Sequence, residues 1–132
     1  MRNLPMTTIN NVELLNDIVS HVTDDATKER LNRYNGKIIG RYQHYENNFT
    51  SLDNIRPLDA SEWSEVKDDL VALYKNSTQF KKVRNELLSV PKCPFCTLSR
   101  PNTLDHYFDK SDYPEFSVFT PNLVPVVRNV MA

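Results

Sequence analysis

Cys93 and Cys96 are two residues of this chain whose type and spacing could do chemistry. Two thiolates separated by two residues can bind one tetrahedral zinc ion from a tight turn, at Zn–S distances of roughly 2.3 Å. A thioredoxin-like redox pair is the alternative, but it needs a βαβ context with the pair at a helix N-terminus. Because the preceding segment has a helical pattern and the following one contains Pro101 and Asn102, the sequence favours half of a zinc knuckle.

A second candidate site lies in the run Thr103–Tyr107, where Asp105 stands next to His106. At the end of a short strand, the carboxylate can bind a divalent cation while the imidazole takes a proton from water. Acid–histidine pairs are common on protein surfaces, so this pair alone is weak support for a site. A second strand is expected at Ser117–Phe119, and Asn122 follows it between two prolines, which suits a turn that hydrogen-bonds the backbone.

Four short motifs follow one another in this part of the chain: C-x-x-C, L-D-H-Y, Y-P-E-F and N-L-V-P. In this order and spacing they resemble the motifs of bacterial HNH (ββα-metal) endonucleases, which are often found in mobile or phage-defence settings. The resemblance is specific over about residues 90–130 and looser over the helical region before them.

The resemblance implies metal-dependent hydrolysis of DNA phosphodiester bonds. By position, His106 matches the general base, Asp105 the ligand of a catalytic Mg²⁺ or Mn²⁺ ion, and Asn122 the residue that orients the base through its loop. Cys93 and Cys96 match the first half of a structural zinc site. The implied catalytic ion stabilises charge on the scissile phosphate and the leaving oxygen while the histidine deprotonates water. Similar nucleases are often paired with an ATPase, which the resemblance suggests as a partner.

The sequence departs from the family pattern at two places. Val127 and Val130 stand where a second cysteine pair is expected, so a zinc ion would have two thiolates unless another residue or a partner completes the site. The family also places a helix after the knuckle, which completes the catalytic metal site, and the sequence stops at Ala132. We therefore expect a truncated or inactive nuclease that lacks a complete active site. The alternatives are a non-catalytic nuclease-like subunit that binds a partner such as an ATPase, and a DNA-binding zinc module.

The elements that must position these residues are mostly helical. Apolar residues at helical spacing predict one helix over about residues 10–22 and a longer one from about residue 24 to residue 47. Gly36 and Gly40 fall inside the longer helix, where close packing against a neighbour would offset their cost of roughly 1 kcal/mol each.

Two further helices are expected before the cysteines. Asp59 and Glu62 have the spacing of a capping box at the start of a third helix, which Asn76–Thr78 interrupts before a fourth. The expected fold class is α+β. Residues 1–90 form a helical N-terminal region, and residues 91–132 form a truncated ββα-metal core with a zinc knuckle and without its C-terminal helix.

A basic stripe runs along the longer predicted helix, offset by about one residue from the apolar stripe. Its members are Arg30, Arg33, Lys37, Arg41 and His44. One interpretation is a phosphate-binding face, with Arg33, Lys37 and Arg41 as nucleic-acid contacts. The other is a solvated helix flank, which is the commoner meaning of such a charge run.

The overall charge places a limit on any nucleic-acid contact. The net charge is −1 and the pI is about 6.3, so no global basic field exists and a contact must come from a local patch. No stretch approaches the roughly 18 apolar residues of a membrane span, and residues 1–6 lack the apolar part of a secretory signal. A cytoplasmic setting is the simplest expectation.

Overall fold

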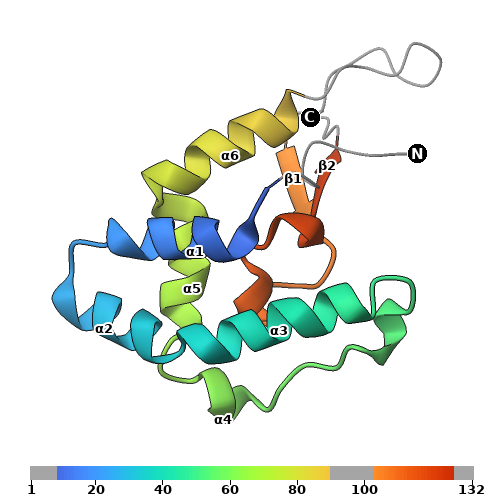
Figure 1. The fold of residues 1–132 in the computed structure, drawn as a ribbon, viewed down its shortest axis with the longest axis horizontal. Coiled ribbons are helices and arrows are strands. Elements are labelled where there is room, and N and C mark those ends of the chain that lie inside the picture. The colour runs from blue at the N-terminus through green and yellow to red at the C-terminus, as the bar shows by residue number, and fades with distance from the viewer. Residues whose placement is uncertain (1–8, 90–102, 127–132) are drawn as a thin grey trace, which may run out of the picture.

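The computed structural model describes residues 9–89 and 103–126. Within these ranges the fold is α+β, as expected, with α-helical segments followed by one two-stranded antiparallel sheet (Figure 1). The α-helices are α1 (Asn11–Ser20), α2 (Asp25–Arg33), α3 (Asn35–Asn47), α4 (Ala60–Trp63), α5 (Lys67–Asn76) and α6 (Thr78–Leu88). The strands are β1 (Thr103–His106) and β2 (Leu123–Val126), and three 3₁₀ turns are η2 (Leu52–Asn54), η3 (Pro114–Phe116) and η4 (Thr120–Asn122).

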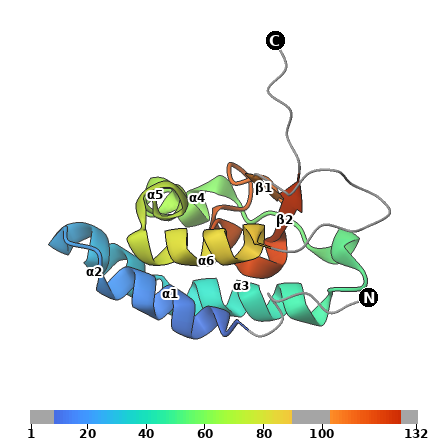
Figure 2. The same ribbon diagram turned by 90° about the horizontal axis from the view of Figure 1, so that it is seen from above.

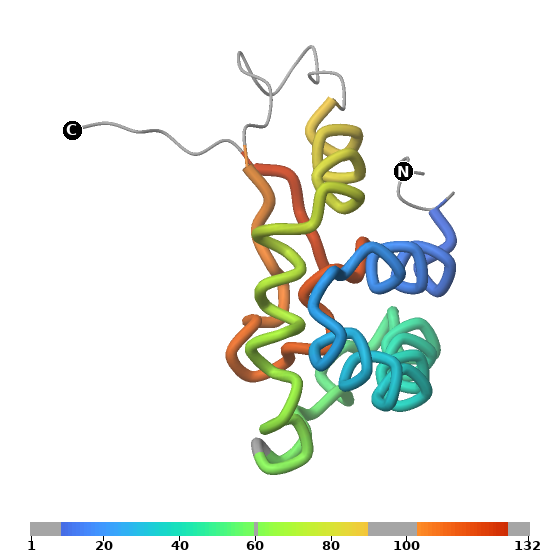
Figure 3. The backbone as a smooth tube through the Cα atoms, turned by 90° about the vertical axis from the view of Figure 1, so that its left-hand side faces the viewer, coloured from blue at the N-terminus to red at the C-terminus, as the bar shows by residue number. Residues whose placement is uncertain are grey.

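The elements form two layers, one with α1 and α3 and one with α5 and the sheet (Figure 2). Seen from above, α1 and α3 lie on one side, whereas α5 and the sheet lie on the other (Figure 2). The view from the left-hand side shows the same separation (Figure 3). No helix among the described residues is long and apolar enough to cross a membrane.

The first predicted helix is confirmed as α1. The side chain of Asn10 caps it by accepting hydrogen bonds from the backbone N–H groups of Val12 and Glu13, both at 3.1 Å. Apolar residues at helical spacing then point inward, and the buried ones are Leu15, Ile18 and Val19. This spacing makes one face of the helix apolar, and that face joins the core.

The longer predicted helix is wrong in one respect, because the structure divides it into α2 and α3 at Tyr34. The backbone of Tyr34 has φ −94° and ψ 2°, outside the helical region. Asn35 and Gly36 follow, and both are weak helix formers, so the break falls where the helical preference is lowest. The amide of Ile38 still donates to the carbonyl of Tyr34 at 3.0 Å, so the two helices adjoin.

The third predicted helix is also divided, into α4 and α5. Asp59 caps α4 by accepting a hydrogen bond from the Ser61 amide at 3.2 Å. The carboxylate of Glu62 pairs with Lys37 of α3 instead of closing the predicted capping box. The fourth predicted helix is confirmed as α6, and Ser77 caps it through the Phe80 amide at 3.0 Å.

Gly36 and Gly40 do not provide the close packing that the sequence suggested. A Cβ atom at either position would meet nothing within 4 Å, neither residue has a positive φ, and both are exposed. Their absence of a side chain therefore has no packing role in the described structure.

We expect Gly40→Ala to stabilise the protein by about 0.5–1 kcal/mol, because alanine restricts the unfolded chain and fits the helical backbone without strain. Urea denaturation of the variant and the wild-type protein measures the difference. Gly36→Ala is the companion variant, with a smaller gain because Gly36 lies in the first turn of α3. A lower midpoint for Gly40→Ala would show that an unseen neighbour needs the space.

The sheet begins where expected but its second strand lies elsewhere. β1 coincides with the predicted strand, whereas Ser117–Phe119 is a turn and β2 starts at Leu123. Local hydrogen bonds explain the difference: the Phe119 amide donates to the Phe116 carbonyl at 3.3 Å. Pro125 is tolerated inside β2 because it sits opposite Leu104, at a position whose nitrogen faces away from β1.

A single hydrophobic core includes residues from both the helices and the segment after residue 103. Trp63, Leu70 and Phe80 contribute from the helices, and Phe116 and Phe119 from the loop between the strands. α3 lies under that loop. It contributes Tyr42, whose ring stacks on Phe119 at 4.2 Å, and Tyr45, whose hydroxyl donates to the Pro121 carbonyl at 3.2 Å. The loop therefore has a fixed helical support.

Candidate active site around His106

His106 ends β1 on the face of the sheet that packs toward the helices. Side chains alternate along a strand, so His106 shares a face with the buried Leu104, while Asp105 points to the other, exposed face. The imidazole is half-buried and meets the ring of Tyr74 from α5 edge-on, with 4.6 Å between ring centroids. The sheet and α5 together fix the position of this ring.

A hydrogen bond fixes the tautomer of His106. Its Nε2 lies 2.9 Å from the carbonyl oxygen of Ser117. A carbonyl oxygen only accepts, so Nε2 must carry the proton and donate it. In the neutral imidazole, Nδ1 is then left as the basic nitrogen, and no hydrogen bond to Nδ1 occurs among the described residues. Such a ring can accept a proton from water at Nδ1.

The surroundings favour the neutral, proton-accepting form of this histidine. Burial lowers the pKa of His106 below its ordinary value of 6.5, and the nearby ammonium of Lys110 lowers the pKa further. The hydrogen bond to Ser117 and the carboxylates of Asp105 and Asp109 act in the opposite direction without reversing the shift. A base must be unprotonated before it can act, and this environment meets that requirement near neutral pH.

Asn122 fixes the loop that follows His106. Its side chain is fully buried, its Oδ1 accepts from the Phe108 amide at 2.9 Å, and its Nδ2 donates to the Phe108 carbonyl at 3.1 Å. The backbone carbonyl of Asn122 also accepts from the Tyr107 amide at 2.8 Å. These bonds join the start of β2 to the two residues after His106, and the loop-orienting role that the resemblance implies for Asn122 stays a prediction.

We expect Asn122→Ala to destabilise the protein by about 2–3 kcal/mol, because it removes two hydrogen bonds and leaves the Phe108 amide and carbonyl without partners. Thermal and urea denaturation measure this loss. Asn122→Asp keeps the acceptor for the Phe108 amide but places a second carboxylate oxygen against the Phe108 carbonyl in a buried site, so it should lose at least as much. Asn54→Ala is the matched control, since Asn54 is exposed and makes one weak side-chain bond; an equal effect of Asn54→Ala and Asn122→Ala would contradict the assigned role.

The predicted metal ligands receive less support from the geometry. Among the described residues, no group of three or more His, Cys, Asp or Glu side chains could hold a metal ion. Asp105 is one exposed carboxylate, on the opposite face from His106. An ion there would need further ligands from water, from a substrate phosphate or from the rest of the chain, as Mg²⁺ commonly has. The predicted zinc ligands Cys93 and Cys96, and the positions of Val127 and Val130, lie outside the described residues.

The basic stripe on α2 and α3 is engaged with carboxylates. Each of its four long cationic side chains makes an ion pair: Arg30 with Asp69 at 2.8 Å, Arg33 with Glu65 at 3.2 Å, Arg41 with Glu115 at 2.8 Å, and Lys37 with Glu62. The fifth member, His44, lies 3.3 Å from the Asn48 amide through its Nδ1. Nucleic-acid binding by Arg33, Lys37 and Arg41 stays a prediction, and it would have to compete with these pairs.

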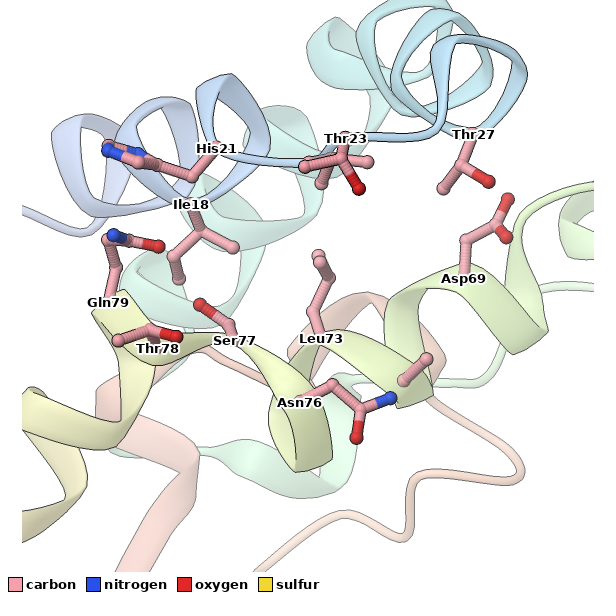
Figure 4. Close-up of a pocket in the computed structure, with 12 residues that line it drawn as sticks. Ile18, His21, Thr23, Thr27, Asp69, Leu73, Asn76, Ser77, Thr78 and Gln79 are labelled. Carbon is pink, nitrogen blue, oxygen red and sulfur yellow. The ribbon is translucent and has the colours of Figure 1, made fainter.

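A pocket of about 520 Å³ lies away from His106, between the turn that joins α1 to α2 and the turn that joins α5 to α6 (Figure 4). The apolar side chains of Ile18 and Leu73 face it, together with polar groups such as those of His21 and Asn76. None of the site residues predicted from the sequence lines this pocket.

Comparison with known proteins gives no relative of the chain. No protein-family model, no curated protein and no solved structure matches it. The residues themselves therefore provide the basis for the functional argument.

Proposed function

We propose that this chain is the HNH-type part of a metal-dependent endonuclease that hydrolyses phosphodiester bonds of DNA. One observation supports the proposal most: His106 presents a basic Nδ1 while its Nε2 donates to Ser117, and Asn122 clamps the loop that follows it. The motif set around these residues points to the same class of enzyme. Phage defence as the setting and an ATPase as the partner are proposed on the resemblance alone.

In the proposed reaction, His106 removes a proton from a water molecule through Nδ1. The resulting hydroxide attacks phosphorus, a P–O bond forms, and the bond from phosphorus to the leaving oxygen breaks. The imidazolium that forms keeps its Nε2 hydrogen bond to the Ser117 carbonyl, which stabilises the added positive charge. Asn122 keeps the loop after His106 in place throughout. A divalent ion bound with help from Asp105 would supply charge stabilisation at the phosphate.

Nicking of supercoiled plasmid tests the proposal. We expect the purified chain, or its Val127→Cys/Val130→Cys form prepared with zinc, to produce relaxed circles slowly with Mg²⁺ or Mn²⁺ and none with EDTA, because the resemblance implies a base and one metal ligand without the rest of the metal site. The double variant is included because the valines stand at the expected zinc-ligand positions. If neither form cuts DNA with either ion, the nuclease proposal fails.

The alternative is a non-catalytic nuclease-like subunit that binds a partner, which the two valines favour because they remove expected zinc ligands. This alternative predicts no cutting in the plasmid assay together with formation of a stable complex with an ATPase on size-exclusion chromatography. Metal-dependent cutting that requires His106 would exclude it.

A further inference from the structure

One stretch of the chain is basic although the chain as a whole is slightly acidic. Residues 70–85 contain Lys75, Lys81, Lys82 and Arg84 and no Asp or Glu, whereas the net charge of the protein is −1. The three lysines are exposed, and the stretch runs from α5 into α6. This basic stretch is therefore the kind of local patch that a nucleic-acid contact would require in a near-neutral protein.

The basic stretch reaches His106 through a cluster of side chains around Tyr74. The guanidinium carbon of Arg84 and the Nζ of Lys110 each lie 4.8 Å from the centroid of the Tyr74 ring. His106 meets the same ring at 4.6 Å. Figure 1 shows how the fold allows this, because α6 and β1 lie near each other at one end of the molecule. Two cations from distant parts of the sequence are thus placed beside the candidate base.

The cations of this Tyr74 cluster form no salt bridge among the described residues, although the carboxylates of Asp105 and Asp109 lie close enough to act on the cluster electrostatically. Neither Arg84 nor Lys110 takes part in a salt bridge there, in contrast to the four paired cations of α2 and α3. Lys110 makes no hydrogen bond to the described residues. The neighbouring carboxylate of Asp109 accepts hydrogen bonds from the amide and hydroxyl of Ser111 instead.

Arg84 is held in place beside the ring of Tyr74. One terminal nitrogen donates to the carbonyl of Tyr74, and Nε is buried without a partner. Contact with an aromatic ring uses the charge of a cation but not its N–H groups. The buried Nε is closed to an approaching oxyanion, so Arg84 contributes positive charge beside the ring and Lys110 contributes an ammonium without a hydrogen-bond partner among the described residues.

We propose that Arg84 and Lys110 of the Tyr74 cluster, together with the exposed lysines of the basic stretch, bind the phosphodiester backbone of DNA next to His106. This inference rests on the proposed function, because it assigns the substrate-binding surface of the same site. It moves the DNA contact from the carboxylate-paired stripe of α3 to the unpaired cations of α5, α6 and the turn after β1.

DNA binding without catalysis tests this surface. The full chain is titrated against a fluorescein-labelled 20-base-pair duplex in EDTA, and fluorescence anisotropy gives the affinity over a series of salt concentrations. We expect Lys81→Gln and Lys110→Gln each to weaken binding by about two- to fivefold. Each should also reduce the slope of log affinity against log salt by about 0.9, because one phosphate contact fewer releases fewer counterions.

Two controls separate charge from structure. Lys37→Gln removes a lysine that is paired with Glu62 on the paired stripe, and it should leave the affinity and the salt slope unchanged. Lys110→Arg keeps the charge and should retain wild-type binding. Equal losses for Lys37→Gln and Lys81→Gln, a loss for Lys37→Gln alone, or no binding by the wild-type protein at 50 mM salt would each overturn the proposal.

The binding experiment and the plasmid-nicking experiment can fail independently of each other. Anisotropy in EDTA reports DNA binding alone, because no metal-dependent cutting takes place without the ion. If DNA binds through the basic stretch and plasmid is never cut, the nuclease proposal fails and this inference stands. If plasmid is cut while Lys81→Gln and Lys110→Gln bind normally, the inference fails and the nuclease proposal stands.

Discussion

Substituting His106 by alanine is expected to slow plasmid nicking by about 10²- to 10⁴-fold, the range that a positioned general base contributes. The variant loses the imidazole whose Nδ1 has no hydrogen bond among the described residues and is the proposed proton acceptor. The loss should appear in the rate at saturating DNA, because His106 acts on water and Arg84 and Lys110 supply the proposed binding contacts. Initial rates of relaxed-circle formation with Mn²⁺ measure the effect.

The matched control is His44→Ala, which removes a half-buried histidine of α3 that makes a polar contact with Asn48 alone among the described residues. It should nick plasmid at the wild-type rate. Added imidazole should restore part of the activity of His106→Ala, because a free base can occupy the vacated position, whereas it should not change His44→Ala. Equal rates for the wild-type protein and His106→Ala would remove His106 from the reaction.

The candidate site residues Asp105, His106 and Asn122 came from short motifs that resemble a known family, and their roles stay predictions. Their contacts could not be predicted in this way. The Ser117 carbonyl that binds His106 was not foreseen, because the sequence favoured a strand at Ser117–Phe119 and the structure has a turn there. Besides its local hydrogen bond, that turn has the Phe119 ring packed on Tyr42 and Tyr45 of α3, a long-range contact that leaves no local pattern.

The placement of Arg84 and Lys110 beside Tyr74 could not be predicted from the sequence for a related reason. They are 26 positions apart in the sequence, and only the approach of α6 to β1 brings both to the ring of Tyr74. Tyr74 itself also packs on the core, with its ring centroid 5.4 Å from that of Phe80. A cation beside an aromatic ring across such a separation leaves no periodic signal. Three-dimensional placement was needed to distinguish these cations from ordinary surface charge.

The helices show the same limit. Apolar periodicity predicted α1 and α6 well, because each has one continuous inward face. It did not predict the breaks at Tyr34 and between α4 and α5, since an apolar stripe can continue across two helices that meet at an angle. The basic stripe was also ambiguous from sequence, and its carboxylate partners became visible only when α5 and η3 were placed beside α2 and α3.

The partner of Arg41 supplies the second large prediction, because Glu115 is buried at the centre of the contact between α3 and η3. Its side chain has no exposed surface, and its Oε2 accepts from Arg41 Nε at 2.8 Å. Arg41 also donates to the Arg56 carbonyl at 2.7 Å and lies over the Phe116 ring. We expect Arg41→Ala to cost about 3–5 kcal/mol at pH 7, because it leaves a buried carboxylate without its cation.

The stability lost in Arg41→Ala should grow as the pH rises. Burial raises the pKa of Glu115 above its ordinary value of 4.5, although Arg41 and, more weakly, Lys37 lower it. Tyr42 and Tyr113 also face this carboxylate, and the charge of Glu115 contributes to their raised pKa values. The folded protein thus holds a proton on Glu115 where the unfolded chain has released it. The stability due to this group is therefore present below pH 4.5 and falls as the pH rises through the raised pKa.

Removing Arg41 raises the pKa of Glu115 further, which widens the pH range over which stability falls. The difference in free energy of unfolding between Arg41→Ala and the wild-type protein should therefore be smallest near pH 4.5, where protonation of Glu115 is favoured, and largest at pH 7. Urea denaturation at both pH values measures it. Arg33→Ala is the control: its pairs with Glu29 and Glu65 are exposed, so it should change the free energy of unfolding little at either pH. If the Arg41→Ala loss is the same at both pH values, it comes from lost packing, and the buried charge of Glu115 does not govern the contact between α3 and η3.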